Sequence, residues 1–144
     1  MNRAAKSYSK YAVLLALSAC ALSPFRETQD WNFMQSVGGI TLGVPQNKDG
    51  WWSLPVNCDV SGLHEFSRKP TMLNSGMEWV NTITSFKQGR IYLTIETTIA
   101  SSLQNWTPGC GPASLGRLKA GQYQVYYKDP DGTVHPIQSI DVKP

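Results

Sequence analysis

The sequence predicts an all-β fold, an antiparallel β-sandwich of about seven short strands that occupies residues 36–144. Three observations lead to this prediction. Apolar and polar residues alternate in several segments, no segment carries the apolar stripe of an amphipathic helix, and glycines and prolines separate the alternating segments. A chain of 144 residues suits one domain of this kind.

Two segments in the first half of the predicted domain, residues 37–44 and 51–60, show this alternation. The side chains expected to face inward are Ile40, Leu42 and Val44 in the first segment and Trp52, Leu54, Val56, Cys58 and Val60 in the second. Pro55 interrupts the second segment and has no N–H group to donate. This strand is therefore expected to lie at a sheet edge or to carry a bulge at Pro55.

The clearest predicted strand is residues 90–99, where β-branched residues and strict alternation indicate a half-buried strand. Residues 77–86 are predicted to form the strand before it, joined by a short hairpin connection at residues 87–89. The side chains expected to face inward from the second strand are Ile91, Leu93, Ile95, Thr97 and Ile99.

The C-terminal part carries the most specific fold signal. Residues 118–125 have the spacing L-x-x-G-x-Y-x-V, which resembles the entry to the penultimate strand of immunoglobulin-like and fibronectin-like sandwiches. In those folds a tyrosine closes a corner by hydrogen bonding back to the backbone. The resemblance implies that Tyr123 forms this corner, and Val125 and Tyr127 are expected to point inward with it. A turn at residues 129–132 and a closing strand at 133–142 complete the predicted sandwich.

The N-terminus has the three parts of a secretory signal peptide. Basic residues precede a short apolar run over residues 11–19, and small residues follow it. The run ends at Leu17-Ser18-Ala19-Cys20, which resembles the lipobox of bacterial lipoproteins. The resemblance implies that residues 1–19 are removed as a signal peptide and that Cys20 becomes the lipid-modified first residue.

Lipidation at Cys20 would hold the protein on a membrane of the bacterial cell envelope, with residues 20–35 as a tether to the domain. Ala21 follows the cysteine, at the position where aspartate favours inner-membrane retention in this family. In a bacterium with two membranes, the resemblance therefore implies delivery to the outer membrane. Two alternatives to lipidation are a membrane-spanning helix and cleavage without lipid. The apolar run is about half the length that a membrane-spanning helix needs. Ordinary cleavage within Ala19-Cys20-Ala21 would give a soluble periplasmic or secreted protein.

The charge of the mature chain bears on its partners. Three of the 13 basic residues precede Cys20 and all 10 acidic residues follow it, so the mature chain is formally neutral. No basic patch in the sequence indicates a nucleic-acid partner. The expected partners are a membrane, through the lipid at Cys20, and a protein or polysaccharide of the envelope.

Cysteine usage predicts a disulfide. If Cys20 carries lipid, Cys58 and Cys110 remain in an oxidising compartment, where pairing is expected. The sequence has no C-x-x-C motif, so a structural bridge is favoured over a redox pair. Closing a loop of roughly 50 residues stabilises the fold by about 4 kcal/mol in the chain-entropy treatment.

No catalytic, metal or cofactor site is predicted from the sequence. His64 and His135 are interpreted as surface residues, and the H-E-x-x-H and G-x-S-x-G motifs are absent. A pair of carboxylates could support glycoside cleavage, but their separation is not fixed by sequence. The acids in or beside predicted loops are Asp49, Asp59, Glu65 and Glu78.

The tryptophans supply the candidate binding residues. Trp51 and Trp52 are adjacent in one predicted strand, so they are expected to point to opposite faces. Trp106 lies in a polar loop. Exposed tryptophans stack on sugar rings or anchor protein interfaces, so Trp51 and Trp106 are the candidates. The alternative is that these rings fill the ends of the sandwich.

Three functions follow from these features, in descending order of support. The first is a non-enzymatic, lipid-anchored accessory module that binds envelope proteins or polysaccharide. The second is a periplasmic inhibitor or immunity protein that inserts a rigid loop, such as residues 101–116, into a hydrolase. The third is a carbohydrate hydrolase that uses the loop acids.

Overall fold

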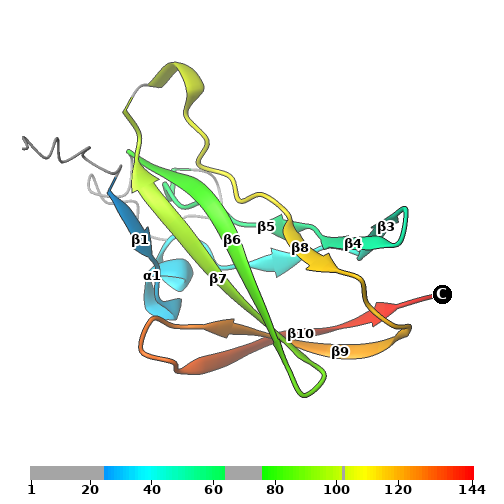
Figure 1. Cartoon of the computed structure of the whole chain (residues 1–144). Helices are drawn as coiled ribbons and strands as arrows, with labels where there is room; N and C mark the ends of the chain where they lie inside the picture. Colours follow the sequence, from blue (N-terminus) through cyan, green and yellow to red (C-terminus); the bar gives the residue numbers. More distant parts are fainter. Residues whose placement is uncertain (1–24, 64–75, 102) are drawn as a thin grey trace, which may run out of the picture.

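The computed structural model describes residues 25–63, 76–101 and 103–144. The signal peptide, the lipobox with Cys20, the first residues of the expected tether, His64 and Glu65 lie outside the described residues. The described elements are β1 (Arg26–Thr28), α1 (Trp31–Ser36), β2 (Thr41–Leu42), β3 (Gln46–Lys48), β4 (Trp51–Leu54), β5 (Val56–Asn57), β6 (Met77–Lys87), β7 (Arg90–Ile99), the 3-10 helix η1 (Leu103–Asn105), β8 (Ala113–Gly116), β9 (Gly121–Lys128) and β10 (Val134–Val142). The fold is all-β, as predicted, and its strands form a sandwich (Figure 1).

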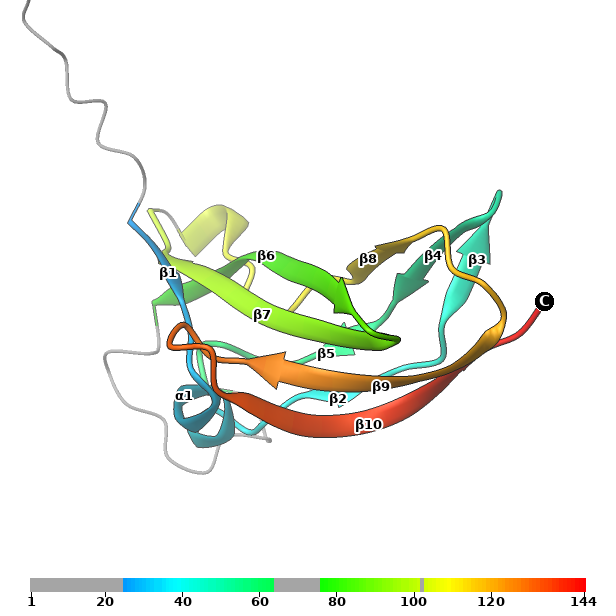
Figure 2. The same cartoon turned by 60° about the horizontal axis from the view of Figure 1, so that its bottom comes forward.

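One layer is a large sheet of five strands. One edge of β7 pairs along its length with β6. The other edge pairs with β9 through residues 90–93 and with β1 through residues 96–98. β10 pairs with β9 in antiparallel fashion. Figure 2 shows β6, β7, β9 and β10 side by side.

All the described strand pairings but one are antiparallel, as expected; the exception is the β7–β9 pairing, which is parallel. Parallel neighbours need a long crossover connection because a hairpin cannot join them. Residues 100–120 provide that connection and place β8 in the other layer before the chain returns as β9.

The second layer consists of two small sheets, β2–β5 and β3–β4–β8. Pro55 separates β4 from β5, so one extended segment contributes to both sheets. The sequence predicted an edge strand or a bulge at Pro55, but β4 is the central strand of its sheet and its register shift lies at Trp52/Ser53. At Pro55 the strand ends instead, because proline has no N–H group to continue a ladder. The Pro55 carbonyl still accepts a hydrogen bond from the Gly43 N–H (2.9 Å), which keeps the segment paired across the break.

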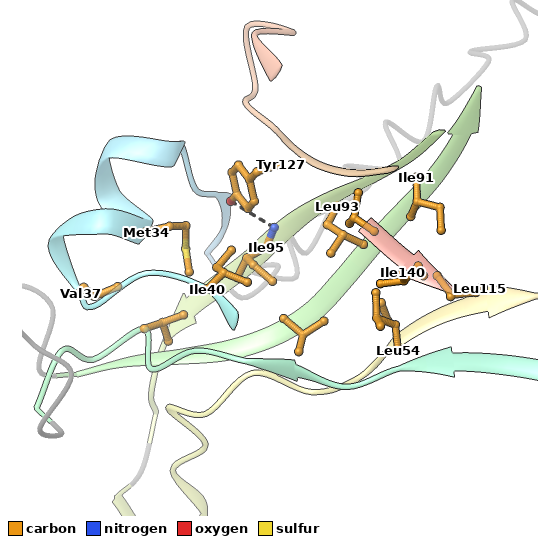
Figure 3. Packing of buried hydrophobic residues seen from close by; sticks show 14 residues of the cluster. Met34, Val37, Ile40, Leu54, Ile91, Leu93, Ile95, Leu115, Tyr127 and Ile140 are labelled. Atoms are coloured by element: carbon orange, nitrogen blue, oxygen red, sulfur yellow. Dashed lines mark hydrogen bonds between the residues drawn. The ribbon is translucent and has the colours of Figure 1, made fainter. Parts of the chain in front are cut away.

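The core lies between these layers, with α1 packed at one end (Figure 3). The large sheet contributes inward side chains at every second residue, and the small sheets contribute theirs from the opposite side. The fully or nearly fully buried apolar residues are Met34, Val37, Leu54, Val56, Val60, Ile91, Leu93, Ile95, Ala113, Leu115, Val125, Tyr127, Ile140 and Val142. Most of the alternation read from the sequence is therefore confirmed.

Two predicted inward residues are exposed instead. Ile99 is 63% exposed because it lies at the end of β7, beyond the core, while Thr98 is buried beneath the β1 segment and donates to the Phe25 carbonyl. Val44 is 80% exposed because β2 ends at Leu42, and alternation has no meaning outside a strand.

The domain also begins earlier than expected. Residues 26–35, assigned to the tether, form β1 and most of α1, and Met34 is completely buried. The Asp30 carboxylate caps α1 by accepting from the Phe33 N–H at 2.7 Å. No sequence pattern predicts this helix, because its six residues are too few to show a helical period.

The predicted turns and the tyrosine corner are confirmed. Gln88 and Gly89 both have positive φ (52° and 74°), as a two-residue type I′ hairpin requires. The Tyr123 hydroxyl donates to the Lys119 carbonyl at 3.0 Å, four residues back along the chain. This bond fixes the entry to β9, which then directs Val125 and Tyr127 into the core.

Candidate functional site

Trp51 is the tryptophan most open to a partner among the described residues. It is 56% exposed and begins β4, opposite Lys48 of β3. The Arg117 guanidinium carbon lies 5.7 Å from the centre of its ring, within the range of a cation–π contact. The pairing of Trp52 with Gly116 brings the start of β4 beside the end of β8, so that Arg117 reaches the neighbouring Trp51 ring. The Trp51–Arg117 pair presents both an aromatic face and a positive charge at one end of the sandwich.

Trp52 points the other way, as the alternation of a strand requires. It is half-buried and packs against the hydrophobic core. The expectation that these adjacent tryptophans face opposite sides is confirmed.

Trp106, the second candidate, has a structural contact. It is half-buried, and its indole N–H donates to the Met77 carbonyl at 2.9 Å, at the start of β6. Trp79 lies nearby and is also engaged: its indole N–H donates to the Thr82 hydroxyl at 3.1 Å, and its ring covers Gly111 so closely that a Cβ there would lie 2.2 Å from it. These two rings bind the loop before β8 to the large sheet.

The predicted disulfide is present between Cys58 and Cys110, whose Cα atoms are 5.2 Å apart. The Cys110 N–H also donates to the Cys58 carbonyl at 3.0 Å. Cys58 follows β5 and Cys110 precedes β8, so the bridge ties together the two small sheets.

A cavity of about 270 Å³ lies beside this disulfide, lined mainly by Gly38, Gly39, Thr41 and Asn57. Asp59 is the one carboxylate among the described lining residues. It accepts hydrogen bonds from the N–H (3.0 Å) and hydroxyl (2.6 Å) of Ser61. Glycoside cleavage by two acids needs a second carboxyl group across the cavity, and the described lining supplies none.

The other loop acids are dispersed. Asp49 has a positive φ of 54° in the turn between β3 and β4, whereas Asp59 lies ten residues on, beyond β5. Glu78 belongs to β6. The described acids therefore do not converge on one pocket.

The structure reveals one polar cluster that sequence reasoning missed. His135 is half-buried, and its Nε2 lies 2.8 Å from the Asp129 carboxylate. The Trp31 ring stacks on the imidazole, with 5.3 Å between ring centres and 8° between planes, and also contacts Tyr127. The reading of His135 as a simple surface residue is therefore wrong.

This cluster attaches α1 to the large sheet. The second Asp129 oxygen accepts the Trp31 backbone N–H at 2.7 Å. The Tyr127 hydroxyl donates to the Gln29 carbonyl at 2.7 Å and accepts from the Ile95 N–H at 3.3 Å (Figure 3 shows the latter bond). Burial raises the pKa of Tyr127 far above its usual range, so the hydroxyl stays protonated and keeps this donor role. One sequence feature could have indicated the cluster: Asp129 lies in a turn, six residues before His135 in the next strand.

Within residues 25–63, 76–101 and 103–144, no three His, Cys, Asp or Glu side chains are grouped so that they could hold a metal ion. The same part of the chain has no helix with the length and hydropathy to cross a bilayer.

Comparison with protein-family models, curated proteins and solved structures finds no match to this chain.

Proposed function

We propose that the protein is a lipid-anchored, non-enzymatic binding module of a bacterial cell envelope, with Trp51 and Arg117 at its contact site. The observation that carries the proposal is the exposed Trp51 ring with the Arg117 guanidinium beside it. Tryptophan and arginine are the residue types most often found at the energetic centre of an interface. The lipobox ending at Cys20 supplies the anchor in this proposal.

The fate of the other aromatic residues supports Trp51 as the contact. Trp31, Trp79 and Trp106 each make a ring stack or an indole hydrogen bond inside the domain. These contacts stabilise the fold, and this role alone accounts for the presence of the three tryptophans. Trp51 makes its one described ring contact with another surface side chain, so much of its apolar area is left for a partner.

The Asp129–His135 pair also supports a non-enzymatic role, because its contacts lie inside the domain. A catalytic aspartate orients a histidine that must reach a nucleophile. Here the Trp31 ring covers one face of the imidazole, and Asp129 also binds the helix backbone. The pair is accounted for by its role in attaching α1.

The inhibitor alternative receives less support. Such a protein needs a rigid loop that projects from the domain. In the candidate loop, η1 projects from the sandwich (Figure 1), but residues 107–111 are held against it. Thr107, Pro108 and Gly111 accept hydrogen bonds from Trp79, Val60 and Thr82, respectively.

Binding to an isolated envelope preparation tests the contact site. In a Cys20→Ser background that carries no lipid, we expect Trp51→Ala to weaken the affinity for that preparation, measured by co-sedimentation, by about thirtyfold, equivalent to about 2 kcal/mol. Ile99→Ala is the matched control, because Ile99 is an equally exposed apolar residue elsewhere. Equal losses in both variants, or no loss in either, would contradict the assignment of Trp51.

The anchor requires a separate test. We expect the Cys20→Ser variant to leave the membrane fraction and to lose incorporation of labelled palmitate. A variant that fractionates like the parent, with neither taking up the label, would remove the lipid from the proposal.

A further inference from the structure

The outer face of the large sheet carries a second arrangement of aromatic and charged side chains. Tyr92 of β7 and Tyr126 of β9 are register partners, and their rings stack with 5.6 Å between centres and 25° between planes. The Arg90 guanidinium carbon lies 5.7 Å from the centre of the Tyr126 ring. Both tyrosines alternate with buried residues, so they lie on the side of the sheet opposite the core.

Polar and apolar residues adjoin Tyr92, one member of this tyrosine pair. A cavity of about 380 Å³ lies over the sheet, lined by Ser85, Phe86, Lys87, Tyr92, Lys128 and Val134. Phe86 and Val134 are 47% and 44% exposed. A shallow site with ring faces, hydroxyl groups and amines suits a sugar, whose carbon face stacks and whose hydroxyl groups take hydrogen bonds.

The charges of the site indicate the kind of sugar. Lys87 and Arg90 are register partners at one end of the tyrosine pair, and Lys128 lies at the other end. No carboxylate occurs among the described residues that line this cavity. On the same face, Glu96 lies further along β7, where it pairs with Arg26 at 3.9 Å.

The spacing of the cations favours a polymer over a single anion. Arg90 is level with Gln124, and Lys128 follows four residues later on β9, about 13 Å along the strand. Cations that hold one phosphate group converge on it. Arg90 and Lys128 instead lie on either side of the stacked Tyr92–Tyr126 pair, the aromatic platform of this face. Because the mature chain is formally neutral, this local cluster is what would attract an acidic polymer.

We infer that the outer face of β6, β7 and β9 binds a polysaccharide that carries carboxylate groups. The Tyr92–Tyr126 pair stacks on its sugar rings, and Lys87, Arg90 and Lys128 neutralise successive carboxylates. The inference deepens the proposed function, from which it takes the binding role, but it uses a surface separate from Trp51.

Affinity measurements on the mature lipoprotein in detergent test this site. The probes are polygalacturonate, alginate and hyaluronate, with neutral dextran and fully methyl-esterified polygalacturonate as uncharged controls. We expect binding to at least one acidic polymer, at least tenfold weaker binding to the uncharged controls, and a marked loss when salt is raised to about 1 M, where the screening length is about 3 Å.

Variants assign the binding to residues. We expect Tyr126→Ala and the double variant Lys87→Gln/Lys128→Gln each to weaken binding at least tenfold. The matched control is Lys119→Gln/Lys143→Gln, which removes two exposed lysines outside this cavity. Thermal unfolding of each variant checks that the fold is retained, and because the lysines are exposed, the double variant remains informative if Tyr126→Ala unfolds.

The outcomes separate this inference from the proposed function. Binding to none of the three acidic polymers, equal binding to dextran, or binding only to anionic lipid vesicles would overturn the acidic-polysaccharide site. Ile99→Ala, which changes an exposed apolar residue outside both sites, should leave polysaccharide affinity unchanged. If Trp51→Ala abolishes that affinity while Lys87→Gln/Lys128→Gln does not, the outer-face assignment is wrong and the polysaccharide is assigned to the Trp51 site.

Discussion

The two layers of the sandwich reach stability by different means. Four strands of the large sheet, β6, β7, β9 and β10, are 8 to 11 residues long, whereas the strands of the small sheets have two to four residues. Long strands share many backbone hydrogen bonds and present a full row of inward side chains. Short strands share few, and the Cys58–Cys110 bridge lies where the two small sheets meet. The difference indicates that one layer relies on its ladder and the other on a covalent link.

The largest expected effect comes from removing that link. Cys58→Ala with Cys110→Ala should lower the free energy of unfolding by about 4 kcal/mol, because the bridge closes a loop that spans 52 residues. Urea unfolding measures the loss. Amide exchange should quicken in β4, β5 and β8 before it does in β7. Equal acceleration of amide exchange in both layers would contradict the idea that the small sheets depend on the disulfide more than the large sheet does.

The next largest effect is a difference in stability between Trp31→Ala and Trp51→Ala, because Trp31 packs against the large sheet and Trp51 lies exposed on a small sheet. Trp31→Ala should destabilise the domain by about 3 kcal/mol, since the ring packs on His135 and Tyr127 where α1 meets the large sheet. Trp51→Ala, on the small-sheet layer, should change stability by no more than about 0.5 kcal/mol, because that ring is exposed. Thermal or urea unfolding of both variants under one condition gives the contrast. Similar losses would show that Trp51 is structural.

The smallest expected effect concerns the β9–β10 turn. The Asp131 carboxylate accepts the Thr133 N–H at 2.8 Å, and this bond lowers the pKa of Asp131 in the folded protein. A lowered pKa favours the charged form in the folded state, so the contribution to stability is present above the unfolded pKa. It is lost as the pH falls through the folded pKa, below the ordinary value of 3.8.

Asp131→Asn tests this turn contribution. The variant should be slightly less stable than the parent at neutral pH, and the difference should shrink as the pH falls below about 4. Unfolding measured between pH 7 and pH 2 follows that difference. A gap that widens in acid would show that the carboxylate destabilises the turn.

Sequence patterns predicted the strands that are long and one-sided. Residues 90–99 were assigned with the same bounds that β7 has, because alternation over ten residues is hard to produce by chance. The Gln88–Gly89 hairpin and the Tyr123 corner were also found, since each depends on residues close in sequence. The disulfide followed from the cysteine count once Cys20 was set aside.

Other features were missed because their partners are distant in sequence. The parallel β7–β9 pair joins residues about 34 apart, and no local pattern encodes such a pairing. Trp31 approaches His135 across about 100 residues, so neither residue alone signals the cluster. The platform on the outer face likewise depends on the register between Tyr92 and Tyr126.

The sequence by itself determined the all-β class, the inward faces of β7 and β9, and the expectation that Cys58 pairs with Cys110. These properties depend on local alternation of apolar and polar residues, on turn residues and on the number of cysteines. Only the tertiary structure decided which tryptophans are exposed, where the domain begins and which charges share a surface. Those properties arise when strands far apart in the chain become neighbours, and a linear pattern does not specify that adjacency.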